Sequence, residues 1–181
     1  MKTLAFIRRT GRILTPWLAG LSLAAASRDY PIRAVPFTDF RVQDTFWKPR
    51  LETNRLVTIP YAFEQCEKTG RIANFARAGG LEEGGFQGIY FNDSDVYKII
   101  EGAAYALAQH PDPKLEAYVE GVIAKIAAAQ EPDGYLYTAR TLCGPDYQPP
   151  GGPERWSNIK DGHELYCAGH LYEAAVAWYE A

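Results

Sequence analysis

Two amphipathic segments separated by a short link constrain the fold of this chain more than any other feature. In the first, NDSDVYKIIEGAAYALAQH (92–110), apolar residues recur every three or four positions and fall on one face of a helix. Asp93 or Ser94 is predicted to cap this helix, and Asp95 suits the positive end of its dipole. The helix is expected to end at His110, because a proline follows it.

The second segment begins at Asp112, which is predicted to cap it, with Pro113 in the first turn, where the missing N–H costs nothing. Its apolar residues keep the helical period to about Gln130. Because so few residues link the two predicted helices, we expect them to lie antiparallel as a hairpin.

Two more helices are predicted, one on each side of this hairpin. An apolar stripe with the helical period runs from Leu51 to Cys66, where Pro60 is expected to kink the helix and Gly70 to end it. A fourth helix is predicted from Gly162 to the end of the printed sequence.

Two long connections and a short lead-in complete the pattern. Residues 37–42 alternate apolar and polar side chains, which predicts an extended lead-in. Residues 70–92 are rich in glycine and are predicted to form a loop, as are residues 131–161. The second loop contains Tyr135, Tyr137, Tyr147 and Trp156. Loops of this length are usually functional or disordered, and the aromatic side chains favour function.

Short and long links that alternate between alanine-rich amphipathic helices are typical of helical toroids, which build a site from the loops at one rim. We therefore expect an all-α fold: an incomplete (α/α)6 toroid of about four helices with a short extended N-terminal lead-in. No sequence repeat of the length found in solenoids is visible.

The N-terminus has the order of a secretory signal: basic residues, an apolar run, then small residues. We expect residues 1–26 to be a signal peptide cleaved before Ser27, and residues 27–181 to be part of one domain. The product is then exported, periplasmic or secreted. An uncleaved anchor is the alternative, but the apolar run is too short to span a membrane comfortably, so no stable membrane insertion is expected after cleavage.

Net charge excludes one class of partner. The chain has 19 basic and 22 acidic residues, a formal charge of -3. Without the four basic residues of the predicted signal, 15 basic residues face 22 acidic ones, and no basic patch indicates binding to nucleic acid.

The three cysteines, Cys66, Cys143 and Cys167, are widely spaced and odd in number, which excludes a disulfide framework. We interpret them as buried or unpaired thiols.

The segment DGHELYCAGH (161–170) has the residue types of a zinc motif but not its spacing. Metalloprotease sites place two histidines four residues apart on a helix, whereas His163 and His170 are seven apart. Seven helical residues advance roughly 10 Å, and two nitrogens on one zinc are at most about 4.2 Å apart. His163 and Cys167 have the four-residue spacing, but two ligands do not make a site. No metal site is predicted.

His163 follows an aromatic loop directly and is predicted to project into a pocket as a hydrogen-bonding group or proton carrier. A histidine that caps or packs the core is the alternative, and it is the preferred interpretation of His170. Glu164 points about 100° away from His163 on a helix and can equally serve as a dipole partner. Glu164 and Trp156 are secondary candidates for substrate binding.

Paired carboxylates for glycosidic chemistry are sought among Asp93, Asp95 and Glu101. Helix capping explains Asp93 and Asp95 more simply, and the sequence assigns no pair. Asp93 and Asp95 are kept as secondary candidates for substrate binding.

Three motifs in order support a family resemblance: DSDVYK (93–98), PDGYL (132–136) and HELYCAGH (163–170). With the intervening RW dipeptide, they make the chain from about residue 35 onward resemble the N-terminal part of a known catalytic domain. This is the domain of the glycoside hydrolase family of β-L-arabinofuranosidases, formerly a domain of unknown function. PDGYL alone recurs in other helical toroid enzymes, whereas the combination is specific.

The resemblance implies an (α/α)6 barrel that acts with retention on L-arabinofuranosides or related plant sugars. It also implies a cysteine nucleophile in a zinc site of three cysteines and one glutamate, with a second glutamate as acid/base. No cysteine of this chain matches those positions, so no catalytic residue or cofactor is implied here, and zinc belongs to a longer parent. Only His163 carries over, as the histidine of the HE motif that contacts sugar hydroxyls.

About four helices cannot close a twelve-helix toroid. We therefore expect an N-terminal fragment of an exported glycosidase, inactive alone, whose partner is an arabinofuranoside-type carbohydrate. Two alternatives stay open. One is a non-catalytic carbohydrate-binding or scaffold piece that keeps the aromatic loop and His163. The other is a different (α/α)6 enzyme, such as a hydrolase or lyase for acidic sugars.

Overall fold

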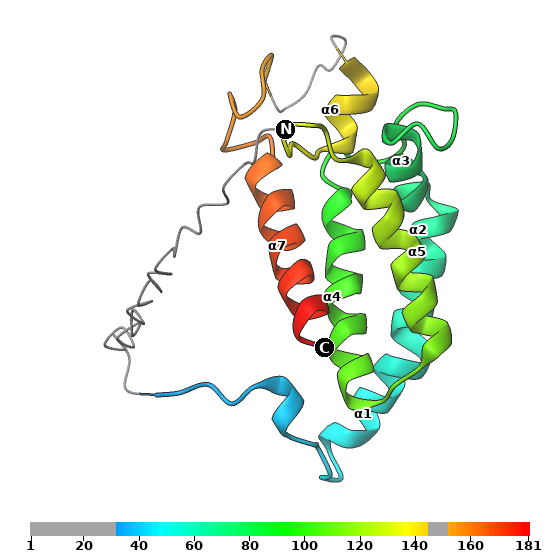
Figure 1. Cartoon of the computed structure of the whole chain (residues 1–181), viewed down its shortest axis with the longest axis vertical. Helices are drawn as coiled ribbons and strands as arrows, with labels where there is room; N and C mark the ends of the chain where they lie inside the picture. The colour runs from blue at the N-terminus through cyan, green and yellow to red at the C-terminus, as the bar shows by residue number, and fades with distance from the viewer. Residues whose placement is uncertain (1–31, 145–151) are drawn as a thin grey trace, which may run out of the picture. The chain divides into compact units, whose positions relative to one another are not determined.

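The computed structural model describes residues 32–144 and 152–181 (Figure 1). It divides the chain into two units, Met1–Ala34 and Val35–Ala181. In the first unit, the described residues 32–34 are exposed and irregular. The predicted signal peptide and Tyr147 lie outside the described residues. No helix in the described part is long and apolar enough to cross a membrane.

The described residues of the second unit are helical, without strands. A 3₁₀ turn, η1 (Phe37–Asp39), precedes a continuous helical run of α1 (Trp47–Thr53), η2 (Asn54–Thr58) and α2 (Ile59–Lys68). The helices after this run are α3 (Arg71–Ala78), α4 (Asp93–Gln109), α5 (Pro113–Ala129), α6 (Thr138–Cys143) and α7 (Glu164–Glu180). The all-α prediction is confirmed.

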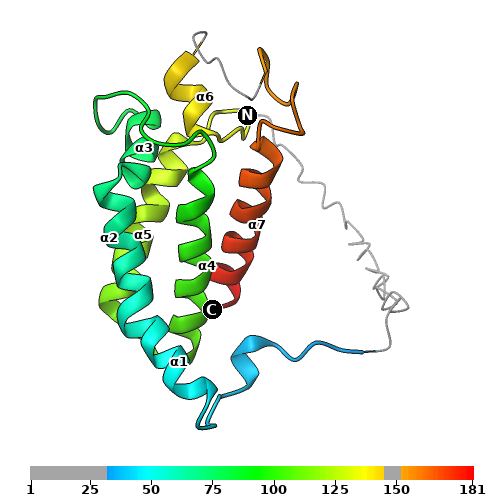
Figure 2. The same cartoon turned by 180° about the vertical axis from the view of Figure 1, so that it is seen from behind.

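Helices α4 and α7 pack along each other, and both begin at the same end of the unit (Figures 1 and 2). Helix α5 runs antiparallel to α4, and α3 packs against α5. Neighbouring helices that alternate in direction while α4 and α7 stay parallel form the arrangement of an incomplete (α/α) toroid. The loops before α4 and α7 therefore meet at one rim.

The central hairpin forms as predicted, because its stop and start signals are local. Helix α4 ends at His110, and the Asp112 carboxylate accepts hydrogen bonds from the backbone N–H groups of Lys114 (3.0 Å) and Leu115 (3.3 Å). These bonds satisfy two of the donors that a helix start leaves free.

Pro60 does not end its helix. Its missing N–H would break the regular ladder, and the preceding residues Asn54–Thr58 form a π-helical turn instead. The N–H of Ile59 donates to the carbonyl of Asn54, five residues back. The backbone thus absorbs Pro60 with a π turn, and the helix continues to Lys68 before Gly70, which has a left-handed φ of 76°.

Two predicted loops contain helices, which add α3 and α6 to the about four helices expected. Helix α3 lies within 70–92 because Ile72, Phe75 and Ala76 bury one apolar face between flanking glycines. Helix α6 lies within 131–161 and has only six residues, too few for a periodic signal. The predicted loop character of 71–78 and 138–143 was therefore wrong.

The extended lead-in is also corrected in part. Residues Phe37–Asp39 form a 3₁₀ turn, closed by a hydrogen bond from the Asp39 N–H to the Pro36 carbonyl, whereas Phe40 is extended. The turn is held beside α4, because Gln109 donates to the Phe37 carbonyl (2.8 Å) and the Phe37 ring meets Tyr105 edge to face.

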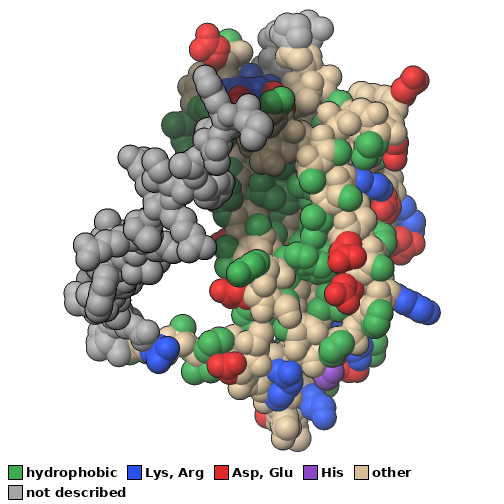
Figure 3. All heavy atoms as spheres, viewed as in Figure 1, with side chains coloured by type: hydrophobic (Ala, Val, Ile, Leu, Met, Phe, Trp, Pro, Cys, Tyr) green, Lys and Arg blue, Asp and Glu red, His purple; other side chains and the backbone are tan. Residues whose placement is uncertain are grey.

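The core lies mainly between α2, α3, α4 and α5, with contributions from α6, α7 and the loop before α6. Phe75 and Tyr97 are fully buried in it, with ring centroids 5.6 Å apart. Helix α7 packs chiefly on α4 and leaves large apolar side chains exposed elsewhere: Leu165, Tyr172, Val176 and Tyr179. Hydrophobic side chains are visible over this side of the unit in Figure 3. As expected for a one-sided set of toroid helices, an apolar face remains uncovered in the described chain.

A close helix contact predicts the effect of one glycine substitution. A Cβ at Gly79 would lie 2.8 Å from the backbone carbonyl carbon of Ala128, where α3 meets α5. We expect Gly79→Ala to lower the free energy of unfolding by about 1–3 kcal/mol through overpacking. Gly102→Ala is the matched control: nothing lies within 4 Å of its Cβ position, so it should stabilise by about 0.5–1 kcal/mol. Urea unfolding measures both, and equal effects would contradict the close contact.

Candidate functional site

The rim at the N-terminal ends of α4 and α7 is the candidate site. It is built from three loops, 79–92, 130–137 and 152–163, which all lead into helices at this end (Figure 1). Buried Asn74 ties the first loop down: its amide donates to the Gln87 carbonyl and accepts from the Gln87 N–H. In the second, Tyr137 is buried and its hydroxyl donates to the Gly162 carbonyl (2.8 Å) in the third.

His163 occupies the position directly before α7 in a left-handed conformation (φ 58°), which is uncommon for a residue with a side chain. Its half-buried ring stacks on Phe91, with ring centroids 4.6 Å apart and planes 19° from parallel. Tyr90 and Tyr166 meet the same ring edge-on at 5.5 and 5.6 Å. His163 thus lies among aromatic rings, and its predicted role as a hydrogen-bonding group or proton carrier in a pocket stays a prediction.

The hydrogen bonds of His163 define its tautomer when the ring is neutral. Nδ1 lies 2.8 Å from the Asp161 carbonyl, which can only accept, so Nδ1 carries the proton. Tyr90 also donates to this carbonyl (3.2 Å). Within the described ranges, no hydrogen-bond partner is found for Nε2. This nitrogen is therefore available as an acceptor.

Glu164 is buried (3% exposed) and points under the rim rather than into solvent. Its Oε1 accepts from the Tyr135 hydroxyl and lies 3.3 Å from Nε of Arg140. Its Oε2 accepts from the backbone N–H of Trp156 (2.8 Å). Glu164 thus joins the second loop, α6 and the third loop, and this geometry gives it an internal role in the rim.

Trp156 is, besides His163, the other described residue apart from glycine with a left-handed backbone, at φ 64°. Its indole is 41% exposed and meets the Tyr135 ring edge-on at 5.3 Å. Arg155 lies over the same Tyr135 ring, 4.0 Å from the centroid. The secondary candidate Trp156 therefore stands on the rim with an open face.

The carboxylates of α4 do not form a catalytic pair, because each has a different partner. Asp93 is fully buried and accepts from the N–H (2.8 Å) and hydroxyl of Thr138, at the start of α6. Asp95 pairs with Arg71 at 2.8 Å, and Glu101 accepts from Tyr105. The prediction that Asp93 or Ser94 caps α4 was wrong: neither side chain does so, and Asp93 instead binds the start of α6.

Burial raises the pKa of Asp93 to about 6, although the two hydrogen bonds from Thr138 act in the opposite direction. Asp93 therefore carries its charge at neutral pH at a cost in stability.

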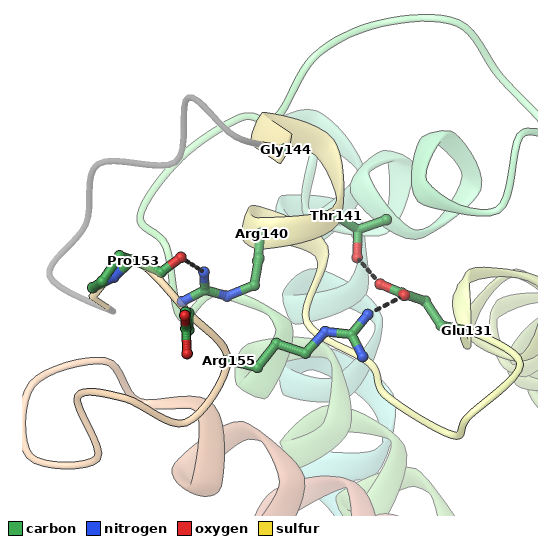
Figure 4. Close-up of a pocket in the computed structure, with 7 residues that line it drawn as sticks. Glu131, Arg140, Thr141, Gly144, Pro153 and Arg155 are labelled. Carbon is green, nitrogen blue, oxygen red and sulfur yellow. Dashed lines mark hydrogen bonds and ion pairs between the residues drawn. The ribbon is translucent and has the colours of Figure 1, made fainter.

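A hollow of about 590 Å³ lies beside the rim, between α6 and the third loop (Figure 4). Arg155 crosses it to pair with Glu131 and with Asp133 (2.6 Å). Arg140 points the other way, towards the carbonyls of Gly152 and Pro153. Neither these two arginines nor Tyr90 and Phe91 were predicted from the sequence. The adjacent aromatic pair, separated from DSDVYK only by Asn92, was the available signal for Tyr90 and Phe91.

A comparison with models of protein families assigns the chain that forms this rim to a family. The model of the β-L-arabinofuranosidase GH127 catalytic domain matches residues 39–181. The chain belongs to this family.

Individual relatives agree with the GH127 assignment. The chain is 44% identical, over 117 residues, to a non-reducing end β-L-arabinofuranosidase of Bifidobacterium longum subsp. longum; the match covers 62% of this chain and 17% of the relative. A solved GH127 β-arabinofuranosidase is 50% identical with a TM-score of 0.77, covering 84% of this chain and 24% of that one. A GH127 β-L-arabinofuranosidase from Geobacillus stearothermophilus T6 is 41% identical with a TM-score of 0.71, covering 78% and 22%. The chain thus spans less than a quarter of the length of these relatives.

The cysteines of this GH127 segment are unpaired, as predicted. Burial raises the pKa of Cys66 to about 11, and it raises that of Cys167, whose Sγ donates to the Phe91 carbonyl. Such thiols stay protonated at neutral pH, whereas a nucleophile or metal ligand must be a thiolate. Neither thiol has the environment of the nucleophile that the family resemblance implies.

The side chains of the rim do not fit a zinc ion. Among residues 32–144 and 152–181, no three His, Cys, Asp or Glu side chains converge as a ligand set. On α7, the Cys167 thiol is buried, and His170 Nδ1 lies 2.9 Å from Glu173. His163 turns Nδ1 to a carbonyl instead. We derive no chemical step from a metal in this part of the GH127 domain.

Proposed function

We propose that this chain supplies part of the sugar-binding wall of a retaining β-L-arabinofuranosidase that acts on plant-type glycans. Membership of the GH127 catalytic domain family and the activity named for its relatives support this assignment. The family match also favours it over an enzyme for acidic sugars. A carbohydrate-binding piece without catalysis stays compatible with the same rim.

The arrangement around His163 carries the proposal. Sugar sites combine apolar faces with a few fixed polar groups, because a sugar ring presents C–H faces and hydroxyls together. The rings of Phe91 and Tyr90 pack against the imidazole of His163. The Asp161 carbonyl accepts a hydrogen bond from Nδ1–H of this imidazole. Nε2 is then the fixed acceptor for a sugar hydroxyl.

The isolated chain is proposed to bind without hydrolysing. The nucleophile and acid/base that the resemblance implies have no counterpart at matching positions here, and the buried thiols Cys66 and Cys167 are not activated. Zinc, if the longer parent uses it, would bind outside this chain. Release of arabinose by the purified 181-residue chain would contradict this part of the proposal.

Export of the protein is proposed from the N-terminal segment, with cleavage before Ser27 and a periplasmic or secreted product. The mass of the mature chain after expression in a bacterial host tests it. A product that keeps residues 1–26 would support the uncleaved anchor.

The binding role of His163 is tested by calorimetry with methyl β-L-arabinofuranoside. We expect millimolar affinity for the wild type and about a five- to tenfold weaker Kd for His163→Ala, the value of a lost neutral hydrogen bond and ring contact. His170→Ala is the matched control, since it changes the same residue type on α7 where the ring is paired with Glu173. Equal affinities for all three proteins would remove His163 from the site.

A further inference from the structure

The third rim loop is held in an uncommon conformation around one buried carboxylate. Outside glycine, the described residues with left-handed backbones are Trp156 and His163, and both lie within reach of Glu164. His163 precedes Glu164 in the chain, and the Trp156 N–H donates to Glu164 Oε2 at 2.8 Å. A left-handed residue with a large side chain costs free energy unless its surroundings hold it.

Glu164 is the centre of the hydrogen bonds that hold the Trp156 backbone. The Glu164 carboxylate accepts hydrogen bonds from the Trp156 N–H, the Tyr135 hydroxyl and the Arg140 guanidinium. Each donor comes from a different element. Tyr135 in turn places its ring edge against the indole. Arg140 also donates to the Gly152 carbonyl (3.2 Å), four residues before Trp156. The backbone of the third loop is therefore held at Gly152 by Arg140 and at Trp156 by Glu164.

The consequence is a tryptophan whose backbone is held by a buried carboxylate while the residue stays partly exposed. Trp156 is not part of the buried core: it is 41% exposed, and its backbone N–H is bound by Glu164, which is 3% exposed. Flat aromatic faces of this kind pack against the C–H face of a sugar ring, while a neighbouring polar group accepts a hydroxyl. His163, adjacent to Glu164 in the chain, is the polar group of the same rim.

We propose that Glu164 is a positioning residue: it does not touch the sugar, but it holds Trp156 in its left-handed turn as a stacking platform for the furanoside bound by His163. The inference rests on the proposed function for the identity of the ligand. The positioning itself can be measured without any ligand.

The test uses the full chain, which has four tryptophans, labelled with 5-fluorotryptophan. The Trp156 resonance is assigned by its loss in Trp156→Phe. In Glu164→Gln we expect the Trp156 resonance alone to move or broaden, and its shift on adding methyl β-L-arabinofuranoside to disappear. Tyr135→Phe is the matched control, because it keeps both the carboxylate and the ring beside the indole, and it should leave the Trp156 resonance in place.

A Trp156 resonance unchanged in Glu164→Gln, or equal changes at Trp47 and Trp178, would overturn the positioning role. If Glu164→Gln does not fold, the wild type decides: the Trp156 amide should exchange slowly with solvent, and fast exchange would overturn the proposal. A wild type in which sugar shifts no tryptophan, while Glu164→Gln still moves Trp156, would refute the sugar platform and the proposed function but not the positioning.

Discussion

Arg140→Ala is expected to lower the free energy of unfolding by about 3 kcal/mol at pH 7. The Arg140 and Glu164 side chains are 11% and 2% exposed, and Nε lies 3.3 Å from Oε1. Removing one partner of a buried ion pair leaves an uncompensated charge, which typically costs about 3–5 kcal/mol. The donors from Tyr135 and Trp156 remain on Glu164, so we place the effect at the lower end.

Urea unfolding of Arg140→Ala and Arg71→Ala makes the comparison. Arg71 pairs with Asp95 at 2.8 Å, but both side chains are partly exposed, and such pairs contribute at most about 1 kcal/mol. Glu164→Gln in the Arg140→Ala background should recover part of the loss, since it removes the buried charge. An Arg140→Ala effect no larger than that of Arg71→Ala would contradict the buried network.

Asp93→Asn is expected to change how stability depends on pH. Because the folded pKa of Asp93 is raised from 3.8 to about 6, the folded state holds the proton more tightly than the unfolded state. The contribution of this group is therefore fully present below pH 3.8 and is lost as pH rises through 6. The loss corresponds to about 2–3 kcal/mol.

An asparagine at position 93 can accept from the Thr138 N–H and donate to the Thr138 hydroxyl without a charge. The difference in unfolding free energy, variant minus wild type, should thus grow by about 2–3 kcal/mol between pH 4 and pH 7. Chemical unfolding at several pH values measures this difference, in which other titrating groups cancel. A difference that stays constant or falls with pH would show that Asp93 is not desolvated as the structure places it.

The parts of the fold that the sequence predicted depend on local signals. The hairpin of α4 and α5 follows from Asp112, Pro113 and the stop at His110, all within a few residues of the backbone groups they affect. Helix α6 could not be predicted in this way. It is six residues long, and its first N–H is bound by Asp93, 45 residues away in the chain. A cap supplied by another helix leaves no trace in the local sequence.

The same distinction applies to the site. His163 was predicted because it directly follows an aromatic loop, on the first turn of the helix expected from Gly162. The role of Glu164 was not, because its donors come from Tyr135 and Arg140, 29 and 24 residues away, and from a backbone N–H. The helical wheel predicted only that Glu164 points in another direction than His163, which in the structure lies before α7 with a left-handed backbone. Only the packed rim shows that this direction leads into the interior.

Binding of an L-arabinofuranoside at the rim formed by the starts of α4 and α7 is the claim on which the proposed function depends. It is tested most directly by amide NMR shifts of the ¹⁵N-labelled chain during titration with methyl β-L-arabinofuranoside. We predict saturable shifts at Tyr90, Phe91, Trp156 and His163, with methyl β-D-glucopyranoside as a control that does not reproduce them. Shifts confined to the opposite ends of α4 and α7, or none up to high millimolar ligand, would contradict the claim.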